Sequence, residues 1–221
     1  MLKHLSVIEK TVLIYTIFFG FLGVYLAIFN TPYFNQIFSV EDGILEWLQF
    51  IGLATISFVF FDRAWHFKRE KSALFMGFAL LVALFFLFAS GEEISWGQRL
   101  FAIESSDFFK SNNLQKETNL HNLVVGETKV NKLIFGTVLG LVFTFYLAVL
   151  SPLYHSSVWV KKWVDDFGIP MPKVYQAVGY ILIVLLVEVL VKFFSDTGRR
   201  GELTEFAAIY MVLLNVTFPR N

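Results

Sequence analysis

The sequence predicts an all-α polytopic membrane protein, a helical bundle that crosses the bilayer several times. Of the 221 residues, 56% are hydrophobic and only 16% are charged, and the mean hydropathy is +0.62. A soluble domain of this size has about 25% charged residues and cannot bury so much apolar surface in one core. Apolar segments of roughly 20 residues recur, each long enough to cross about 30 Å of hydrocarbon as a helix. We therefore expect a single integral membrane domain over residues 1–221.

Six apolar segments are candidates for membrane-spanning helices. They cover residues 12–29, 44–61, 73–90, 133–150, 174–194 and 203–218. The fourth is expected to stop at Ser151 and Pro152, because proline interrupts helical hydrogen bonding. The sixth is short and begins with Glu202 and Glu205. A re-entrant or strongly tilted sixth segment would leave five spans; six is the preferred number.

The distribution of positive charge predicts the orientation. The turn from Arg63 to Lys71 is strongly basic, whereas the turn with Glu41 and Asp42 has no Lys or Arg. Cytoplasmic loops carry an excess of positive charge. We therefore expect a cytoplasmic N-terminus.

A cytoplasmic interfacial helix is expected within residues 152–173. Trp159 and Trp163 lie one helical turn apart there, among lysines and aspartates. Indole rings at headgroup depth with charges toward water are typical of helices that lie on a membrane surface.

Charge and composition exclude several function classes. Eighteen Lys and Arg balance eighteen Asp and Glu, so no basic field attracts nucleic acid. The absence of cysteine excludes disulfides, a thiolate nucleophile and a Cys-ligated metal. The sequence has no Walker loop, G-x-G-x-x-G, G-x-S-x-G or H-E-x-x-H motif.

Residues 91–130 form a polar motif loop, expected on the external side. Glu92 and Glu93 follow the third apolar segment without a spacer. Ionised groups at membrane depth are costly unless they are paired or hydrated, so they mark a candidate functional site. A helix that continued through this motif would place four side chains on one face: Glu92, Ser95, Trp96 and Arg99.

Asn113 is expected to be the N-cap of a short external helix over residues 114–124. On that helix Glu117 and His121 are one turn apart and face the same way. Together they could bind a divalent metal, or the carboxylate could fix the histidine tautomer for proton transfer. A surface position for both residues is the alternative interpretation.

Three polar clusters are expected to converge at one membrane depth: the start of the second span with Glu46, the end of the third span, and the loop with His121. Arg199 and Arg200 stand just before Glu202 and Glu205. This arginine pair could hold a lipid phosphate or complete a buried charge network. The candidate catalytic residues are Glu92, Glu93 and His121, and the candidate metal ligands are Glu117 and His121. The candidate substrate-binding residues are Trp96, Gln98, Arg99, Asn119, Asn122, Glu46, Arg199 and Arg200.

The strings E-E-I-S-W-G-Q-R and N-L-H-N, with E-D-G…E before them, resemble a group of uncharacterised bacterial multi-pass membrane proteins over residues 41–125. The resemblance implies a membrane fold with an external polar site and no established activity. A looser similarity is to CAAX-protease-like membrane proteins, in which an arginine stands four positions after a glutamate pair. Here Arg99 stands six positions after Glu93, and no catalytic residue is carried over.

These observations favour a non-enzymatic membrane subunit, sensor or scaffold that docks a membrane lipid, a protein partner or a second copy of the chain. The alternative is an intramembrane hydrolase or transferase that acts on a lipid or lipid-linked substrate. It would use carboxylate and histidine acid–base chemistry, with or without a divalent metal. A carrier is least favoured, because the chain is short and has no internal repeat. The sequence leaves open whether the protein is an enzyme.

Overall fold

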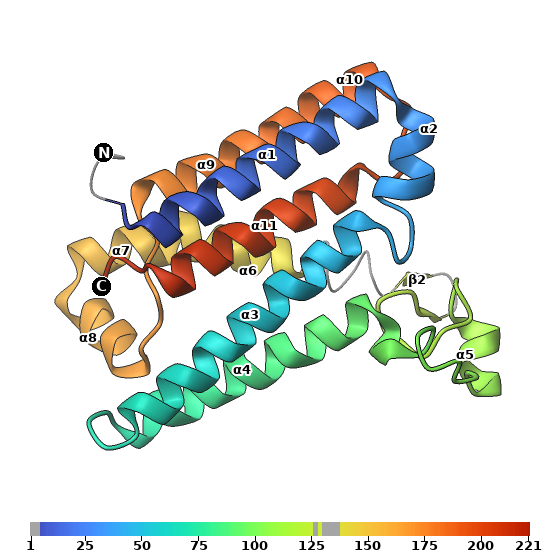
Figure 1. The fold of residues 1–221 in the computed structure, drawn as a ribbon. Coiled ribbons are helices and arrows are strands. Elements are labelled where there is room, and N and C mark those ends of the chain that lie inside the picture. Colours follow the sequence, from blue (N-terminus) through green and yellow to red (C-terminus); the bar gives the residue numbers. More distant parts are fainter. Residues whose placement is uncertain (1–4, 126–127, 130–137) are drawn as a thin grey trace.

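The computed structural model describes residues 5–125, 128–129 and 138–221, and it forms a bundle of long helices (Figure 1). Within these residues, five helical segments are long and apolar enough to cross a membrane. They are Val7–Phe29 (α1), Ile44–Phe67 (α3), Ala73–Glu93 (α4), Leu139–Ser156 and Val174–Phe194. The expected all-α polytopic membrane fold is thereby confirmed.

Two of these spans contain π-helical turns. Leu139–Ser156 consists of α6 (Leu139–Phe145), a π-helical turn (Tyr146–Leu150) and α7 (Ser151–Ser156). Val174–Phe194 consists of α9 (Val174–Leu185), a π-helical segment (Leu186–Val191) and α10 (Lys192–Phe194). The other elements are α2 (Thr31–Tyr33), a π-helical turn (Phe34–Phe38), a 3₁₀ turn (Ser95–Gly97), α5 (Asp107–Asn112), α8 (Val158–Phe167) and α11 (Arg200–Thr217). A two-residue antiparallel pair joins β1 (Val124–Val125) to β2 (Thr128–Lys129).

The sixth apolar segment forms α11, which lies inside the bundle. It packs against α1, α3 and α9 (Figure 1), and Leu203, Phe206 and Leu214 are fully or almost fully buried. Three charged residues stand near its start: Arg200, Glu202 and Glu205. This helix is thus a buried element with a polar beginning, and it differs from the apolar spans that it contacts.

The fourth segment begins outside the described residues, and the expectation that it stops at Ser151 and Pro152 is wrong. The helix continues through α7 to Ser156. Pro152 lies in the first turn of α7 and directly follows the π-helical turn. Proline is tolerated where its missing N–H falls in a first turn or beside a locally altered hydrogen-bond pattern.

Helix α8 is amphipathic, as the tryptophan and lysine pattern predicted. Trp159 and Trp163 are exposed, whereas Val164 is fully buried. The helix ends at Gly168, whose φ of 67° lies in the left-handed region and whose Cβ, if present, would lie 2.1 Å from the Phe75 ring. This glycine allows α8 to pack closely on α4. Its position on a cytoplasmic membrane surface stays a prediction.

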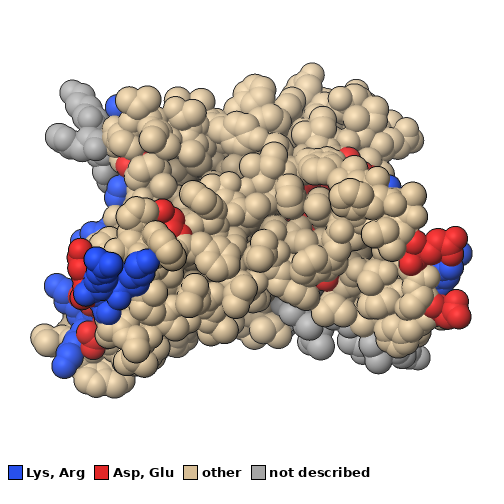
Figure 2. Space-filling view, turned by 60° about the horizontal axis from the view of Figure 1, so that its bottom comes forward, with Lys and Arg blue, Asp and Glu red and all other residues tan. Residues whose placement is uncertain are grey.

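Charged side chains gather at the two ends of the molecule, and an apolar surface lies between them (Figure 2). Large apolar side chains in the middle of long helices are exposed, among them Phe18 of α1 and Leu84 of α4. A soluble monomer seldom exposes a continuous apolar surface of this kind. A protein that crosses a bilayer needs such an apolar surface where it contacts the hydrocarbon.

Gly43 is predicted to be indispensable for the start of α3. A Cβ at this position would lie 2.4 Å from the Val40 carbonyl oxygen and 2.9 Å from that of Ile37. Because these are backbone atoms, Gly43→Ala should lower the free energy of unfolding by about 1–3 kcal/mol. The measurement is thermal unfolding in detergent micelles. Gly77→Ala, which meets no atom within 4 Å, should leave the Tm unchanged or raise it slightly; equal losses in both variants would contradict the prediction.

Candidate functional site

Polar side chains from separate stretches of the chain meet at one end of the bundle, where α3 begins, α4 ends and α11 begins (Figure 1). The segment that follows α4, residues 94–125, folds at this end, and we call it the cap. The cap contains the 3₁₀ turn, α5 and several turns. The site is therefore built where three helix ends and one loop come together.

Helix α4 ends at Glu93, and the backbone then reverses. Ser95 and Trp96 have positive φ values of 47° and 56°, an uncommon conformation for residues with side chains. The Trp96 ring turns back over Gly91, where a Cβ would lie 2.8 Å from it, and its Nε1 donates to Glu92 Oε1 at 2.8 Å. The helix does not continue through this motif, so the expectation that Glu92, Ser95, Trp96 and Arg99 share one helical face is wrong.

The Glu92 carboxylate attaches the cap to the bundle. Its Oε2 accepts hydrogen bonds from the backbone N–H groups of Leu120 at 2.5 Å and His121 at 3.1 Å, while its Oε1 accepts from Trp96. The residue is only 3% exposed. Hydrogen bonds to charged groups contribute about 1.5–3 kcal/mol each, so this side chain makes a large contribution to the position of the cap.

Arg99 forms a second attachment. Its NH1 lies 2.7 Å from the Asp42 carboxylate and its Nε lies 2.8 Å from Glu117 Oε1. The other Glu117 oxygen accepts from the Ser95 hydroxyl at 2.5 Å. Arg99 therefore joins the cap to the turn that precedes α3, and its guanidinium is held by two carboxylates.

The expected helix over residues 114–124 is wrong. Asn113 Oδ1 accepts the backbone N–H groups of Gln115 at 2.8 Å and Glu117 at 3.3 Å, which closes a turn. Lys116 has a φ of 61°, and a left-handed residue cannot lie inside an α-helix. The short helix of the cap is α5, which ends before this turn.

Three amide residues that the sequence proposed for substrate binding, Gln98, Asn119 and Asn122, form hydrogen bonds within the cap. Gln98 Nε2 donates to Ser105 Oγ at 2.6 Å, and its Oε1 accepts the Thr118 N–H at 2.7 Å. Asn119 Oδ1 accepts the Asn122 N–H at 2.9 Å. These contacts satisfy the polar groups of a segment with little regular secondary structure.

The two arginines at the start of α11, Arg199 and Arg200, have different contacts. Arg199 NH1 donates to the Ser39 carbonyl at 2.9 Å and lies 3.5 Å from Glu41. Arg200 lies 3.4 Å from Glu188 in a half-exposed pair. Of the two roles that the sequence left open, the contacts of Arg199 match the completion of a charge network.

Glu41 and Asp42 lie in the turn before α3, where Glu41 is partly buried and Asp42 is exposed, and both pair with arginines. Asp42 binds Arg99, and its backbone N–H donates to Glu46 Oε2 at 2.5 Å. Asp42 has a φ of 59°, and Gly43 has no room for a Cβ. In the sequence, the E-D-G string directly before an apolar segment is the pattern that indicates this tight turn.

Further carboxylates lie close by inside the bundle. Glu93 of α4 is near Glu202 and Glu205 of α11, close enough for their charges to interact. Gln49 of α3 donates from Nε2 to the Glu202 carbonyl at 3.1 Å. The sequence placed Glu46 and Glu93 in the site but did not include the two α11 glutamates.

His121 lies beside the carboxylates of Glu41 and Glu92. Burial lowers the pKa of the imidazole from its usual value of about 6.5, and the two neighbouring negative charges reverse only part of this effect. His121 is therefore neutral at pH 7.

Glu41 is ionised at neutral pH. Burial raises its pKa, but hydrogen bonds with Glu46 and Gln115 and the positive charges of Arg199 and Arg99 together outweigh that effect and lower the pKa below the usual value. The carboxylate is thus the negative partner of the two arginines.

The proposed metal pair is not assembled in the way the sequence suggested. Glu117 contacts Arg99 and Ser95, whereas His121 lies near Glu41 and Glu92. Among the described residues, no group of three or more His, Cys, Asp or Glu side chains is arranged to hold a metal ion.

Removal of the Glu92 charge should loosen the cap. In Glu92→Gln one oxygen is replaced by an NH₂ group, which cannot accept from the N–H donors that face it. We expect the backbone N–H groups of Leu120 and His121 to exchange with deuterium at least tenfold faster, which corresponds to about 1.4 kcal/mol. Glu104→Gln is the control, because Glu104 is exposed and pairs only with Lys110 in the described contacts. Unchanged exchange in Glu92→Gln would contradict the role of the carboxylate.

The neutral state of His121 predicts a pH dependence of stability. Its pKa is lower in the folded state than the value of about 6.5 in the unfolded chain, so the unfolded chain binds more protons below pH 6.5. The contribution of His121 to stability is therefore lost as the pH falls from 7.5 to 5.5. The fall in Tm over this range should be smaller for His121→Asn than for the wild type, because all other groups titrate in both proteins. An identical fall would show that His121 does not contribute.

No protein-family model, no curated protein and no solved structure matches the chain. The resemblance to bacterial multi-pass membrane proteins and to CAAX-protease-like proteins therefore stays a prediction from the motifs.

Proposed function

We propose that this integral membrane protein is a non-enzymatic membrane component whose polar end holds the cap in a fixed position for docking on membrane lipid. The observation that carries this proposal is that both oxygens of Glu92 accept hydrogen bonds from the cap. A carboxylate used in this way acts as an attachment point. Arg99, engaged by Asp42 and Glu117, acts in the same way.

Part of the outer surface of the cap is apolar, which supports lipid as the partner. Leu100, Phe101 and Ile103 are 64%, 74% and 58% exposed. They come soon after the end of α4 at Glu93, and at the end of a membrane-spanning helix we expect hydrocarbon to give way to headgroups. Apolar and aromatic side chains at that depth partition into the interface. The polar face of the cap binds the bundle, and the apolar face is left for lipid.

The orientation proposed for the protein has the N-terminus in the cytoplasm of a bacterial cell and the cap on the external side of the inner membrane. The basic turn between α3 and α4 lies at the end opposite the cap (Figure 1). Positive residues favour the cytoplasmic side. The orientation rests on this asymmetry.

A hydrolase or transferase is less favoured by the contacts. A general base must reach a proton of the substrate, but Glu92 faces the backbone of the cap and Arg99 faces two carboxylates. The feature that suits acid–base chemistry is the neutral His121 beside Glu41 and Glu92. These three groups are packed where the cap meets the bundle, so their geometry also fits attachment.

The lipid contact can be measured with a single label, because the chain has no cysteine. Phe101→Cys, carrying a nitroxide spin label and reconstituted in phosphatidylcholine–phosphatidylglycerol vesicles, should be more accessible to oxygen than to a water-soluble nickel chelate. Oxygen concentrates in hydrocarbon and the chelate stays in water, so their ratio reports the depth of the label.

The matched control is Lys110→Cys, an exposed site on α5 of the same cap. Its label should be more accessible to the chelate. A Phe101 label that behaves like the Lys110 label would place both in water and would overturn docking on lipid. In that case the apolar surface of the cap would be assigned to a protein partner.

A further inference from the structure

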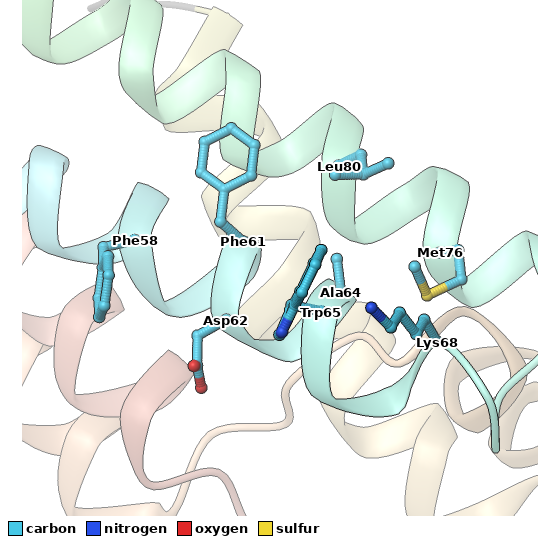
Figure 3. Close-up of a pocket in the computed structure, with 8 residues that line it drawn as sticks. All are labelled: Phe58, Phe61, Asp62, Ala64, Trp65, Lys68, Met76 and Leu80. Carbon is cyan, nitrogen blue, oxygen red and sulfur yellow. The ribbon is translucent and has the colours of Figure 1, made fainter.

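An apolar groove lies between α3 and α4 at the end opposite the cap. Figure 3 shows Phe58, Phe61 and Trp65 along α3, with Met76 and Leu80 along α4. The groove has a volume of about 440 Å³, within the range of about 300–1,000 Å³ that holds small ligands. The groove is open at the surface, where Phe58, Trp65 and Leu80 are exposed.

Two of the residues that line the groove are charged, Asp62 and Lys68, and the end of the groove at Lys68 is basic. Lys68 lies at the end of α3, and its Nζ is 3.2 Å from the centroid of the Trp65 ring. Phe58 lies ten residues earlier in the helix, which corresponds to about 15 Å along the axis. Half of a bilayer's hydrocarbon is also about 15 Å thick. The groove therefore extends from headgroup depth toward the middle of the membrane, the shape that an acyl chain with its headgroup requires.

The charge at the polar end selects among lipids. Residues 62–71 contain four basic and two acidic side chains. One of the acidic residues, Asp62, lies at the groove with its Oδ1 2.9 Å from His66 Nδ1. Lys68 is exposed and contacts Trp65 with one side of its ammonium group, so it can donate to a phosphate. Basic residues beside a membrane attract anionic headgroups.

We infer that this groove binds one acyl chain of an anionic phospholipid, with the headgroup phosphate held by Lys68. Trp65 contributes both to the wall of the groove and to the position of the lysine. A zwitterionic lipid would fill the same apolar wall but has no net charge for the basic end. The inference concerns the opposite end of the bundle and is independent of docking by the cap.

Native mass spectrometry of the full chain in detergent can test the inference. Dioleoyl-phosphatidylglycerol and dioleoyl-phosphatidylcholine are titrated separately, and the apparent Kd of the first bound lipid is compared. The anionic lipid should bind more tightly. Lys68→Gln should weaken its binding about fivefold, the effect of one basic residue near a charged lipid surface. Binding of phosphatidylcholine should change little.

Two further variants separate the groove from general surface charge. Lys162→Gln removes an exposed lysine from α8, outside the groove, and should leave both affinities unchanged. Leu80→Trp fills the groove at a side chain that is 40% exposed and should abolish tight binding without a change in charge. Thermal unfolding confirms that each variant is folded.

Four results would overturn the inference. Equal apparent Kd values for phosphatidylglycerol and phosphatidylcholine would show that the charge of the headgroup does not contribute to binding. Equal losses in Lys68→Gln and Lys162→Gln would assign the effect to surface charge, and unchanged binding in Leu80→Trp would exclude the groove. A dimer that Leu80→Trp dissociates would assign the groove to a second copy of the chain.

Discussion

The structure depends on the requirement that charged groups buried beside hydrocarbon find partners within the protein. Glu92 follows an apolar helix of the bundle and is almost completely buried, yet its carboxylate accepts three hydrogen bonds. Two of the donors are backbone groups of the cap. A segment with little regular secondary structure is thereby held against the bundle, and the same contacts that satisfy the glutamate decide where the cap lies.

This arrangement needs backbone conformations that few residues adopt. The chain reverses after α4 through Ser95 and Trp96, both with positive φ, and it enters α3 through a turn in which Gly43 has no room for a side chain. Such conformations cost about 1–3 kcal/mol each and persist where surrounding contacts enforce them. Here the hydrogen bond from Trp96 to Glu92 and the ion pair from Arg99 to Asp42 do so. Strain and polar contacts are concentrated at the same end of the molecule.

Helix α11 connects this polar end with the opposite one. At its start, the Glu202 carbonyl accepts from Gln49 of α3. Near its end, Asn215 accepts from the Tyr146 hydroxyl at 2.9 Å. The side chains between these contacts form part of the apolar core. The bundle therefore has polar contacts at both ends and an apolar middle, which is the distribution that a bilayer imposes on a protein that crosses it.

Composition and periodicity by themselves determined the class of the protein, its apolar helices and the amphipathic α8, because hydrocarbon requires long apolar helices whatever their neighbours are. The motif residues Glu92, Arg99 and His121 were also recognisable, since charge beside an apolar run is costly. Only the tertiary structure decided what these residues contact. It ended α4 at Glu93, replaced the expected helix after Asn113 by turns, and brought Asp42 to Arg99. Hydrogen bonds between residues far apart in sequence outweighed local helix propensity there, and no local pattern records them.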